Sequence, residues 1–342
     1  MDVAVPEPKK GQVLLEVLKV GICGTDRDII AGFYGESPSG ASKLTLGHES
    51  LCLVSSLGPG VKEPFKKGDL VVPTVRRSCP ENCLNCRSGQ SDFCTTGDYK
   101  EHGIKQLDGF ASEYALSDSN YIVKLPSALS MTGVLLEPLT VVEKGIIQTF
   151  LIQDSRLNWK PRKALVLGAG PVGILAVALL RLRGLQVDAV ATRSEESLKA
   201  RLVRQTGAGY INAKKTDLHT LDGMYDIVFE VTGSPAIALE AQDLIRVNGV
   251  VCYLGIYRQE QDTMQDVGKL FTDLVLGNKI HFGSVNANKS YFERGAKDLI
   301  LIKRRWPDLL GKMITKGSKP EDLSRAYSPE TQEEIKTVIN FR

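Results

Sequence analysis

The spacing of apolar and polar residues predicts a first part of the chain that is rich in β structure. Runs of β-like residues at Gln12–Val20, Leu51–Leu57 and Leu70–Val75 are typical of short strands. Glycine and proline are frequent between these runs, and both residues favour turns. The pattern therefore predicts short strands joined by tight turns.

The next segment has a helical pattern, and after it the pattern of apolar and polar residues changes. The run GVLLEPLTVVEKGIIQTF predicts a helix over Gly133–Phe150, and the polar segment Gln153–Pro161 suits a linker. After Lys163, apolar strands alternate with helical stretches, the first of which is Ile174–Arg183. The predicted strands are Ala164–Leu167, Leu185–Ala191, Gly209–Asn212, Asp226–Val231, Val250–Leu254 and Lys279–Val285. This alternation predicts parallel βαβ units.

Length and composition favour a globular protein of two domains. The chain has 342 residues, of which 42% are hydrophobic and 24% charged. Its 43 basic and 40 acidic residues include no basic tract or acidic tail, so charge supports neither a nucleic-acid nor a membrane partner. The one candidate membrane span, Ala164–Leu180, is short and is interrupted by three glycines and a proline. The N-terminus lacks an apolar signal core, so we expect a cytoplasmic protein.

Four of the seven cysteines are clustered, with the spacing C-x3-C-x2-C-x7-C at Cys79, Cys83, Cys86 and Cys94. A reducing cytosol disfavours a disulfide framework, whereas four thiolates on one loop satisfy tetrahedral zinc and leave no open position. The pattern predicts a structural zinc lobe over residues 79–94. Two alternatives are unligated cysteines and a zinc ribbon that binds nucleic acid, but the latter finds few basic residues nearby.

The first predicted strand of the second part runs into a glycine-rich loop, Gly168-Ala169-Gly170-Pro171-Val172-Gly173, which opens a helix. In this context G-x-G-x-x-G indicates a dinucleotide site, with the pyrophosphate at the helix N-terminus. The second strand ends at Thr192, Arg193 and Ser194 without the carboxylate that usually holds the ribose of NAD. Arg193 with two hydroxyl neighbours suits the 2′-phosphate of NADP. Thr192 or Ser194 could instead cap the next helix.

A second set of metal-ligating side chains lies outside the cysteine cluster. GICGTD offers Cys23 with Thr25 two residues later, LGHE offers His48 and Glu49, and Glu137 is followed by a proline. A lone histidine or cysteine is more often structural. Together, however, a thiolate, an imidazole and a carboxylate form a set typical of catalytic zinc, which keeps a position open for a substrate oxygen.

These motifs, in this order and context, resemble the zinc-dependent medium-chain alcohol dehydrogenases. RRSC, DFCTTGDYKEHGI, LLEPLTVVEKG and GSVNANK resemble the glucose (aldose) 1-dehydrogenase branch more closely. The resemblance implies an α/β fold: a GroES-like β-rich catalytic domain over residues 1–152 and a doubly wound, parallel-sheet Rossmann domain over 153–286. Residues 287–342 would then return to the catalytic domain.

The resemblance also implies two zinc ions per chain, a nicotinamide cofactor (NADP or NAD), a sugar substrate and a homo-oligomer, dimer or tetramer. It assigns Cys23, His48, Glu49 and Glu137 to catalytic zinc, with Glu49 or Glu137 able to come and go as a ligand. Thr25, Glu101, Glu137 and Asn286 match sugar-binding positions, and Asn286 also lies near the nicotinamide in that family. The walls of the nicotinamide pocket match Leu254, Gly255, Ile256, Ser284 and Val285.

The implied reaction is oxidation of an aldose at its anomeric hydroxyl to a lactone. A polyol or secondary-alcohol dehydrogenase on the same scaffold is the nearest alternative, and a non-catalytic dinucleotide- or redox-sensing protein is one of another class. Three departures from the family stand out: the first cysteine spacing is x3 in place of x2, β structure that precedes VPEPKKG in the family is missing, and Val75 and Val141 replace an amide and a carboxylate. We therefore expect a first domain that is incomplete or differently closed, and a less polar sugar pocket.

Overall fold

The structure is a computed structural model that describes residues 4–62, 64–257, 266–322, 326–328, 331 and 333–342. The chain forms two compact units. Unit 1 comprises Met1–Thr140, Asn286–Ile300 and Leu310–Arg342, and unit 2 comprises Val141–Val285 and Leu301–Leu309. The border between Thr140 and Val141 lies inside a helix, whereas the sequence placed it after residue 152.

Unit 1 is built on a seven-stranded sheet in the order β15-β16-β1-β2-β3-β8, with β7 also paired to β1. The strands are β1 (Gln12–Ile22), β2 (Glu49–Leu57), β3 (Leu70–Pro73), β7 (Tyr114–Asp118), β8 (Ile122–Lys124), β15 (Ile314–Ser318) and β16 (Lys336–Asn340). Val13, Leu15 and Val17 are buried at every second position of β1 and pack with Phe110 in the core of this sheet. Strand β16 pairs antiparallel with β1, so the end of the chain completes the sheet.

The predicted strand Leu70–Val75 is too long, because β3 ends at Pro73. Proline offers no N–H to the ladder. After it, β4 (Arg76–Arg77) pairs with β5 (Lys100–His102), and β5 with β6 (Gln106–Leu107), in a separate three-stranded sheet. Between β4 and β5 lies the cysteine segment, which carries α2 (Leu84–Arg87) and the short 3-10 helix η1 (Ser91–Phe93). The remaining short elements of unit 1 are α1 (Gly24–Ile30), η2 (Ser119–Tyr121), η3 (Ser127–Leu129), η4 (Gly133–Leu135), α9 (Leu309–Met313, which begins in unit 2) and η6 (Pro320–Asp322).

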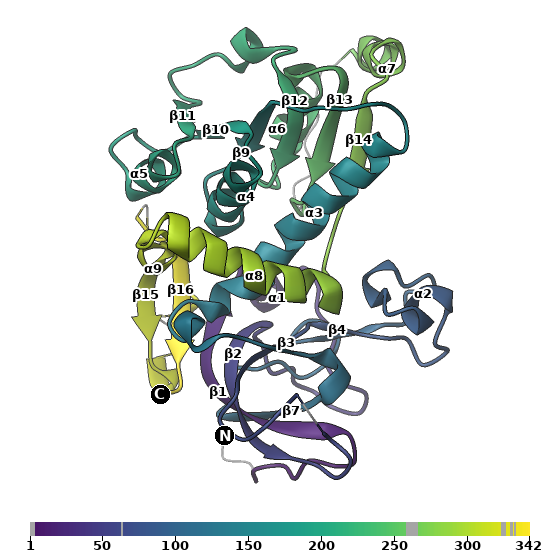
Figure 1. Ribbon diagram of the computed structural model, residues 1–342, viewed down its shortest axis with the longest axis vertical. Coiled ribbons are helices and arrows are strands. Elements are labelled where there is room, and N and C mark those ends of the chain that lie inside the picture. The colour runs from purple at the N-terminus through teal and green to yellow at the C-terminus, as the bar shows by residue number, and fades with distance from the viewer. Residues whose placement is uncertain (1–3, 63, 258–265, 323–325, 329–330, 332) are drawn as a thin grey trace. The chain divides into compact units, whose positions relative to one another are not determined.

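Unit 2 is a parallel sheet of six strands in the order β11-β10-β9-β12-β13-β14, seen side by side in Figure 1. The strands are β9 (Lys163–Leu167), β10 (Gln186–Ala191), β11 (Gly209–Asn212), β12 (Tyr225–Glu230), β13 (Ile245–Tyr253) and β14 (Ile280–Gly283). Numbered from β9, this order reads 3-2-1-4-5-6, which is the doubly wound order of dinucleotide-binding folds. All six strands overlap strands predicted from the sequence.

The helices of unit 2 that lie between these strands are α4 (Pro171–Leu182), α5 (Leu198–Gln205), η5 (Leu218–Leu221), α6 (Pro235–Leu244) and α7 (Val267–Leu276). Two longer helices, α3 (Leu136–Asp154) and α8 (Lys289–Arg305), each include residues of both units. The predicted linker Gln153–Pro161 was wrong at its start, because α3 continues to Asp154. The Gln153 side chain donates a hydrogen bond to the carbonyl of Asn248 and accepts one from Arg156, which holds this end of the helix in unit 2. Among the described residues, no helix is long and apolar enough to cross a membrane.

Candidate metal centres and dinucleotide site

The structure brings Cys23, His48 and Glu49 together in unit 1, with their ligand atoms within 4.8 Å of one another. Cys23 directly precedes α1, His48 directly precedes β2, and Glu49 is its first residue. The register of the sheet explains the meeting, because Glu49 pairs with Gly21 on β1, two residues before Cys23. One thiolate, one imidazole and one carboxylate at this spacing fit a zinc ion that keeps a position open for a substrate oxygen.

Asp26 orients this cluster. Its Oδ2 accepts a hydrogen bond of 2.8 Å from the backbone N–H of Cys23, closing a capping box at the start of α1. Its Oδ1 lies 3.4 Å from Nδ1 of His48, and both residues are buried. Burial by itself lowers the pKa of His48, but the Asp26 carboxylate outweighs it and raises the pKa well above its usual value. A carboxylate at Nδ1 leaves Nε2 as the nitrogen available to a metal.

Glu49 has a buried cationic partner, Lys336 of β16. The Lys336 Nζ lies 2.8 Å and 2.6 Å from the two carboxylate oxygens of Glu49 and also donates to the carbonyl of Ile22 at 3.1 Å. The space is tight, since a Cβ at position 21 would lie 2.2 Å from Oε2 of Glu49, so any larger residue there would displace the carboxylate from its place beside Lys336. The carboxylate is thus held by an ion pair, and a zinc ion would compete with Lys336 for it.

The other predicted residues of the site have different surroundings. Glu137, in the first turn of α3, is not part of the three-residue cluster but lies close enough to interact electrostatically with His48 and Glu49. Burial, with a smaller contribution from Glu49, raises the pKa of Glu137 to about 7. Thr25 is partly exposed in α1. Two predicted sugar-binding residues are in contact, since Asn286 Nδ2 donates to Glu101 Oε1 at 2.8 Å.

Cys79, Cys83, Cys86 and Cys94 form the second cluster, again with their sulfur atoms within 4.8 Å of one another. The additional residue between the first two cysteines is absorbed by a turn: Asn82 has a φ of 50°, and its N–H donates to the carbonyl of Cys79 at 2.9 Å. Backbone hydrogen bonds from Thr95 and Cys86 lower the pKa of Cys83 to about 5, which favours the thiolate. A thiolate tetrad of this geometry fits structural zinc and leaves no ligand position free.

The glycine-rich loop joins β9 to α4 in unit 2. Gly168 has a φ of 111°, and a Cβ at Gly173 would lie 2.0 Å from the carbonyl oxygen of Gly168. Both positions therefore require glycine. Gly170 is the N-cap of α4, and a Cβ there would meet no atom within 4 Å. The open side of Gly170, the free N–H groups and the positive end of the helix dipole form a phosphate-binding arrangement.

At the end of β10, the predicted residues Thr192, Arg193 and Ser194 lie in the loop before α5. The suggestion that Thr192 or Ser194 caps α5 was wrong, because Ser197 is the N-cap and its side chain accepts from Ala200 N–H. Asp188 lies within β10 and accepts from the Tyr225 hydroxyl at 3.0 Å. Glu195, in the same loop, forms ion pairs with Arg204 and Lys215, and Glu196 beside it is exposed. The side chains that directly follow β10 are therefore two hydroxyls and one cation, Arg193, and the two carboxylates come later in the loop.

The residues assigned to the nicotinamide walls lie after β13 and β14. Leu254 and Gly255 are partly exposed, and Ile256 and Val285 are 49% and 53% exposed. Ser284 N–H donates to the carbonyl of Tyr253 at 3.0 Å, and its Oγ is buried without a hydrogen-bond partner in the described part of the chain. A Cβ at Gly255 would lie 2.5 Å from the nitrogen of Gly233. These segments meet at the carboxyl edge of the sheet, where dinucleotides bind.

Sequence reasoning missed Asp26 and Lys336. Asp26 has a local signal, since an acidic residue three positions after an N-cap residue is a capping pattern. Lys336 has no local signal, because it is 287 residues from Glu49.

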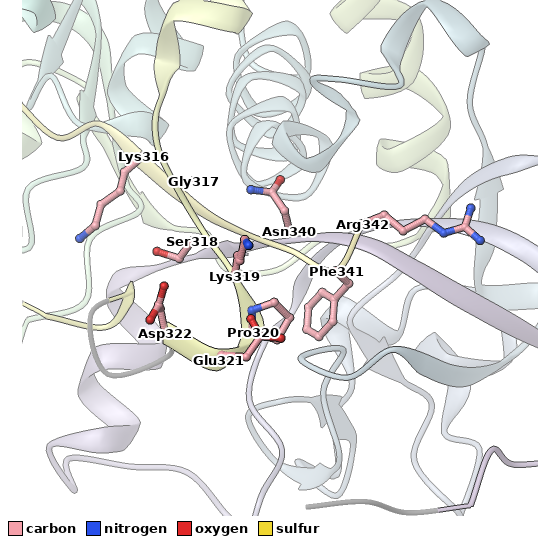
Figure 2. A pocket seen from close by; sticks show the side chains of 10 residues that line it. All are labelled: Lys316, Gly317, Ser318, Lys319, Pro320, Glu321, Asp322, Asn340, Phe341 and Arg342. Carbon is pink, nitrogen blue, oxygen red and sulfur yellow. The ribbon is translucent and has the colours of Figure 1, made fainter.

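A cavity of about 580 Å³ lies elsewhere in unit 1, and Figure 2 shows its lining from β15, η6 and the end of the chain. None of the predicted site residues lines this cavity.

Two family models match the chain. "Glucose dehydrogenase C-terminus" matches residues 130–341, and "Alcohol dehydrogenase GroES-like domain" matches residues 9–127. The chain is 43% identical over 344 residues to a glucose 1-dehydrogenase of Methanocella arvoryzae, covering 100% of this chain and 95% of that relative. It is 46% identical over 340 residues to glucose 1-dehydrogenase 1 of Caldivirga maquilingensis, covering 99% and 94%.

A solved structure is also similar to the whole of this chain. The glucose dehydrogenase of Haloferax mediterranei, in complex with NADP, zinc and gluconolactone, aligns with a TM-score of 0.90 and 28% identity, covering 100% of this chain and 95% of that one. Together with the match to the GroES-like domain, this likeness confirms the predicted fold class: a GroES-like domain and a Rossmann-type parallel-sheet domain.

Proposed function

The chain belongs to the glucose 1-dehydrogenase branch of the zinc-dependent medium-chain alcohol dehydrogenases, and from this premise we propose that it oxidises the anomeric hydroxyl of an aldose to a lactone with a nicotinamide cofactor. The observation that supports the proposal most directly is the cluster of Cys23, His48 and Glu49, backed by Asp26. The relatives carry the name glucose 1-dehydrogenase, and the Haloferax structure holds NADP, zinc and gluconolactone.

The site residues of unit 1 divide the chemistry among them. Cys23, His48 and Glu49 hold the catalytic zinc, with Glu137 as an exchangeable neighbour, and zinc when bound supplies a Lewis acid that lowers the pKa of the sugar hydroxyl. Thr25 contacts the reacting oxygen and passes its proton outward. Glu101 and Asn286 hold sugar hydroxyls. The reaction balances as one proton leaving the hydroxyl and one hydride leaving C1 for the nicotinamide.

We further propose NADP as the preferred cofactor. Gly168, Gly170 and Gly173 receive the pyrophosphate at the start of α4. Arg193 reads the 2′-phosphate, since a guanidinium pairs with phosphate through two parallel hydrogen bonds. Glu195, two residues after Arg193 in the same loop, is already ion-paired with Arg204 and Lys215. The thiolates of both metal clusters suit a reducing compartment, which supports work in the cytoplasm.

The test of this function is an assay of purified protein with a panel of aldoses and polyols, each with NADP and with NAD. We expect aldose oxidation with release of the lactone and close to two zinc ions per chain by elemental analysis. Faster turnover of polyols than of any aldose would favour the polyol or secondary-alcohol alternative. No turnover, together with one zinc per chain, would favour the non-catalytic sensor.

We also propose that the enzyme assembles with a second copy of itself through the β14 side of unit 2. β14 ends the six-stranded sheet, so its outer edge is unpaired within the part of the chain that the structure describes. Helix α7 carries exposed apolar side chains: Val267, Phe271, Val275 and Leu276 are 57–75% exposed. An open strand edge beside an apolar helix surface is a feature that proteins cover.

Light scattering after size exclusion tests the assembly. The double variant Phe271→Glu, Leu276→Glu should shift the protein toward the monomer. Leu151→Glu, at a residue of α3 that is 58% exposed, is the matched control and should leave the mass unchanged. A wild-type monomer, or an unchanged mass for the double variant, would contradict this interface.

A further inference from the structure

Glu101 is bound on one side only. Its Oε1 accepts a hydrogen bond of 2.9 Å from Arg76 Nε and one of 2.8 Å from Asn286 Nδ2. Its Oε2 has no hydrogen-bond partner among the residues that the structure describes. When one carboxylate oxygen accepts two hydrogen bonds, the orientation of the carboxylate is fixed. The other oxygen is then left to accept a hydrogen bond from a ligand.

Arg76 is itself held on several sides. It faces Glu101 as the cross-strand partner in the β4–β5 pair, and its side chain is 5% exposed. Nη1 donates to the backbone carbonyl of Asp92 at 3.2 Å, and the guanidinium carbon lies 3.6 Å from the centre of the Tyr99 ring. Three contacts of different kinds therefore leave the Arg76 fork one orientation.

The contacts of Arg76 extend into the cysteine lobe. Asp92 lies in η1, two residues before the ligand Cys94, and its Oδ1 accepts from Asn288 Nδ2 at 2.9 Å. Asn288 is two residues after Asn286, which has a left-handed backbone with a φ of 58°. Arg76 and Asp92 thus connect Glu101, the lobe and the 286–288 segment in one network of buried polar groups.

We propose that Arg76 is a positioning residue for the sugar: through Glu101 it fixes the Oε2 oxygen that accepts a substrate hydroxyl, and it anchors that oxygen to the zinc lobe. This inference rests on the proposed aldose oxidation. It gives the lobe a role in substrate binding in addition to its role in stability. A lysine at position 76 would keep the charge but would lose the planar fork that contacts Glu101, Asp92 and Tyr99 together.

The test is a double-mutant cycle on the zinc- and NADP-loaded enzyme with Arg76→Lys, Glu101→Gln and the double variant. Arg76→Lys should raise the sugar KM about tenfold, the factor that corresponds to about 1.4 kcal/mol, with zinc content and the KM for NADP unchanged. In the Glu101→Gln background the same substitution should change the sugar KM less than about twofold, because its effect passes through Glu101.

Arg77→Lys is the matched control. Arg77 is the neighbouring residue of β4. It contacts Thr74, His102, Ser117, the Tyr121 ring and the backbone carbonyl of Arg76, but makes no contact to Glu101 among the described residues. Its substitution should leave the sugar KM unchanged. If Arg76→Lys does not fold, Tyr99→Leu, which removes the ring that stacks on Arg76 and also lies 4.7 Å from Lys105 Nζ, should raise the sugar KM in the same direction.

Two results would overturn the inference while leaving the function intact: equal effects of Arg76→Lys with and without Glu101→Gln, or equal effects of Arg76→Lys and Arg77→Lys on the sugar KM. If Tyr99→Leu has to replace Arg76→Lys, an unchanged sugar KM has the same consequence. A wild-type enzyme that oxidises no aldose removes the proposed function and this inference with it, so the two failures are distinguished by the wild-type assay.

Discussion

Replacing Asp26 by asparagine should weaken the catalytic zinc site without unfolding the protein. Asparagine has the same shape and keeps an oxygen that accepts from Cys23 N–H, so the start of α1 is retained. It loses the negative charge beside Nδ1 of His48. With zinc on the other ring nitrogen, His48 is a neutral imidazole whose Nδ1–H donates to the carboxylate.

The magnitude follows from that contact. A hydrogen bond to a charged group contributes about 1.5–3 kcal/mol. The two atoms are 3.4 Å apart and do not meet hydrogen-bond geometry as they stand, so we take the lower end of this range. A loss of about 1.5 kcal/mol corresponds to zinc binding that is about tenfold weaker. This agrees with the 10–100-fold effects that are typical of residues behind a metal ligand.

The measurement is competition for zinc against a chromophoric chelator, with metal analysis after dialysis. Asp26→Asn should retain the lobe zinc at close to one per chain and lose the second ion at chelator concentrations that the wild type withstands. Asp69→Asn is the control, because Asp69 is also buried and accepts from a backbone N–H, that of Lys66, and from Lys124. It should leave both ions bound. Equal zinc affinity in Asp26→Asn and wild type would refute the role of Asp26.

Three further predictions concern the metals, the cofactor and the substrate. Cys23→Ser should remove one zinc ion and the activity. Cys83→Ser should mainly lower the melting temperature, because a zinc site with no open position contributes to folding. Retention of both zinc ions in Cys23→Ser would contradict the assignment. Arg193→Ala should weaken the binding of NADP by about 10–100-fold, as expected for the loss of a contact of about 1.5–3 kcal/mol, and should hardly change the binding of NAD. Equal losses of affinity for both cofactors in titrations would show that Arg193 does not bind the 2′-phosphate. If Val75, which is buried, and Val141 line the sugar pocket as the resemblance implies, they offer sugar hydroxyls no hydrogen bond, at a cost of about 1–3 kcal/mol for each hydroxyl buried. We therefore expect deoxy sugars to rival glucose in kcat/KM, and strong selectivity for glucose would mean that other groups replace the missing partners.

The spacing of residues along the chain was sufficient for much of the fold. Period-two alternation located β1, and short apolar runs separated by helices located every strand from β9 to β14. In the loop Gly168–Gly173, the backbone geometry itself requires glycine. The cysteine cluster was predicted from residue type and spacing, whereas the set with Cys23 and His48 was suggested by residue types and assigned through the family resemblance. Most of these features are local or repeat with a fixed period, so residues that are close in the sequence are enough to predict them.

Only the tertiary structure decided which side chains complete the sites. Lys336 reaches Glu49 across 287 positions and Asn286 reaches Glu101 across 185, through contacts that no local pattern encodes. The same holds for Arg76, which the sequence showed merely as a basic residue beside the cysteines, and for the end of α3, where a side-chain bond to Asn248 extends the helix past the predicted boundary. Such partners are selected by burial: a charged or polar group removed from water must find a counterpart, and the fold alone determines which residue lies within reach.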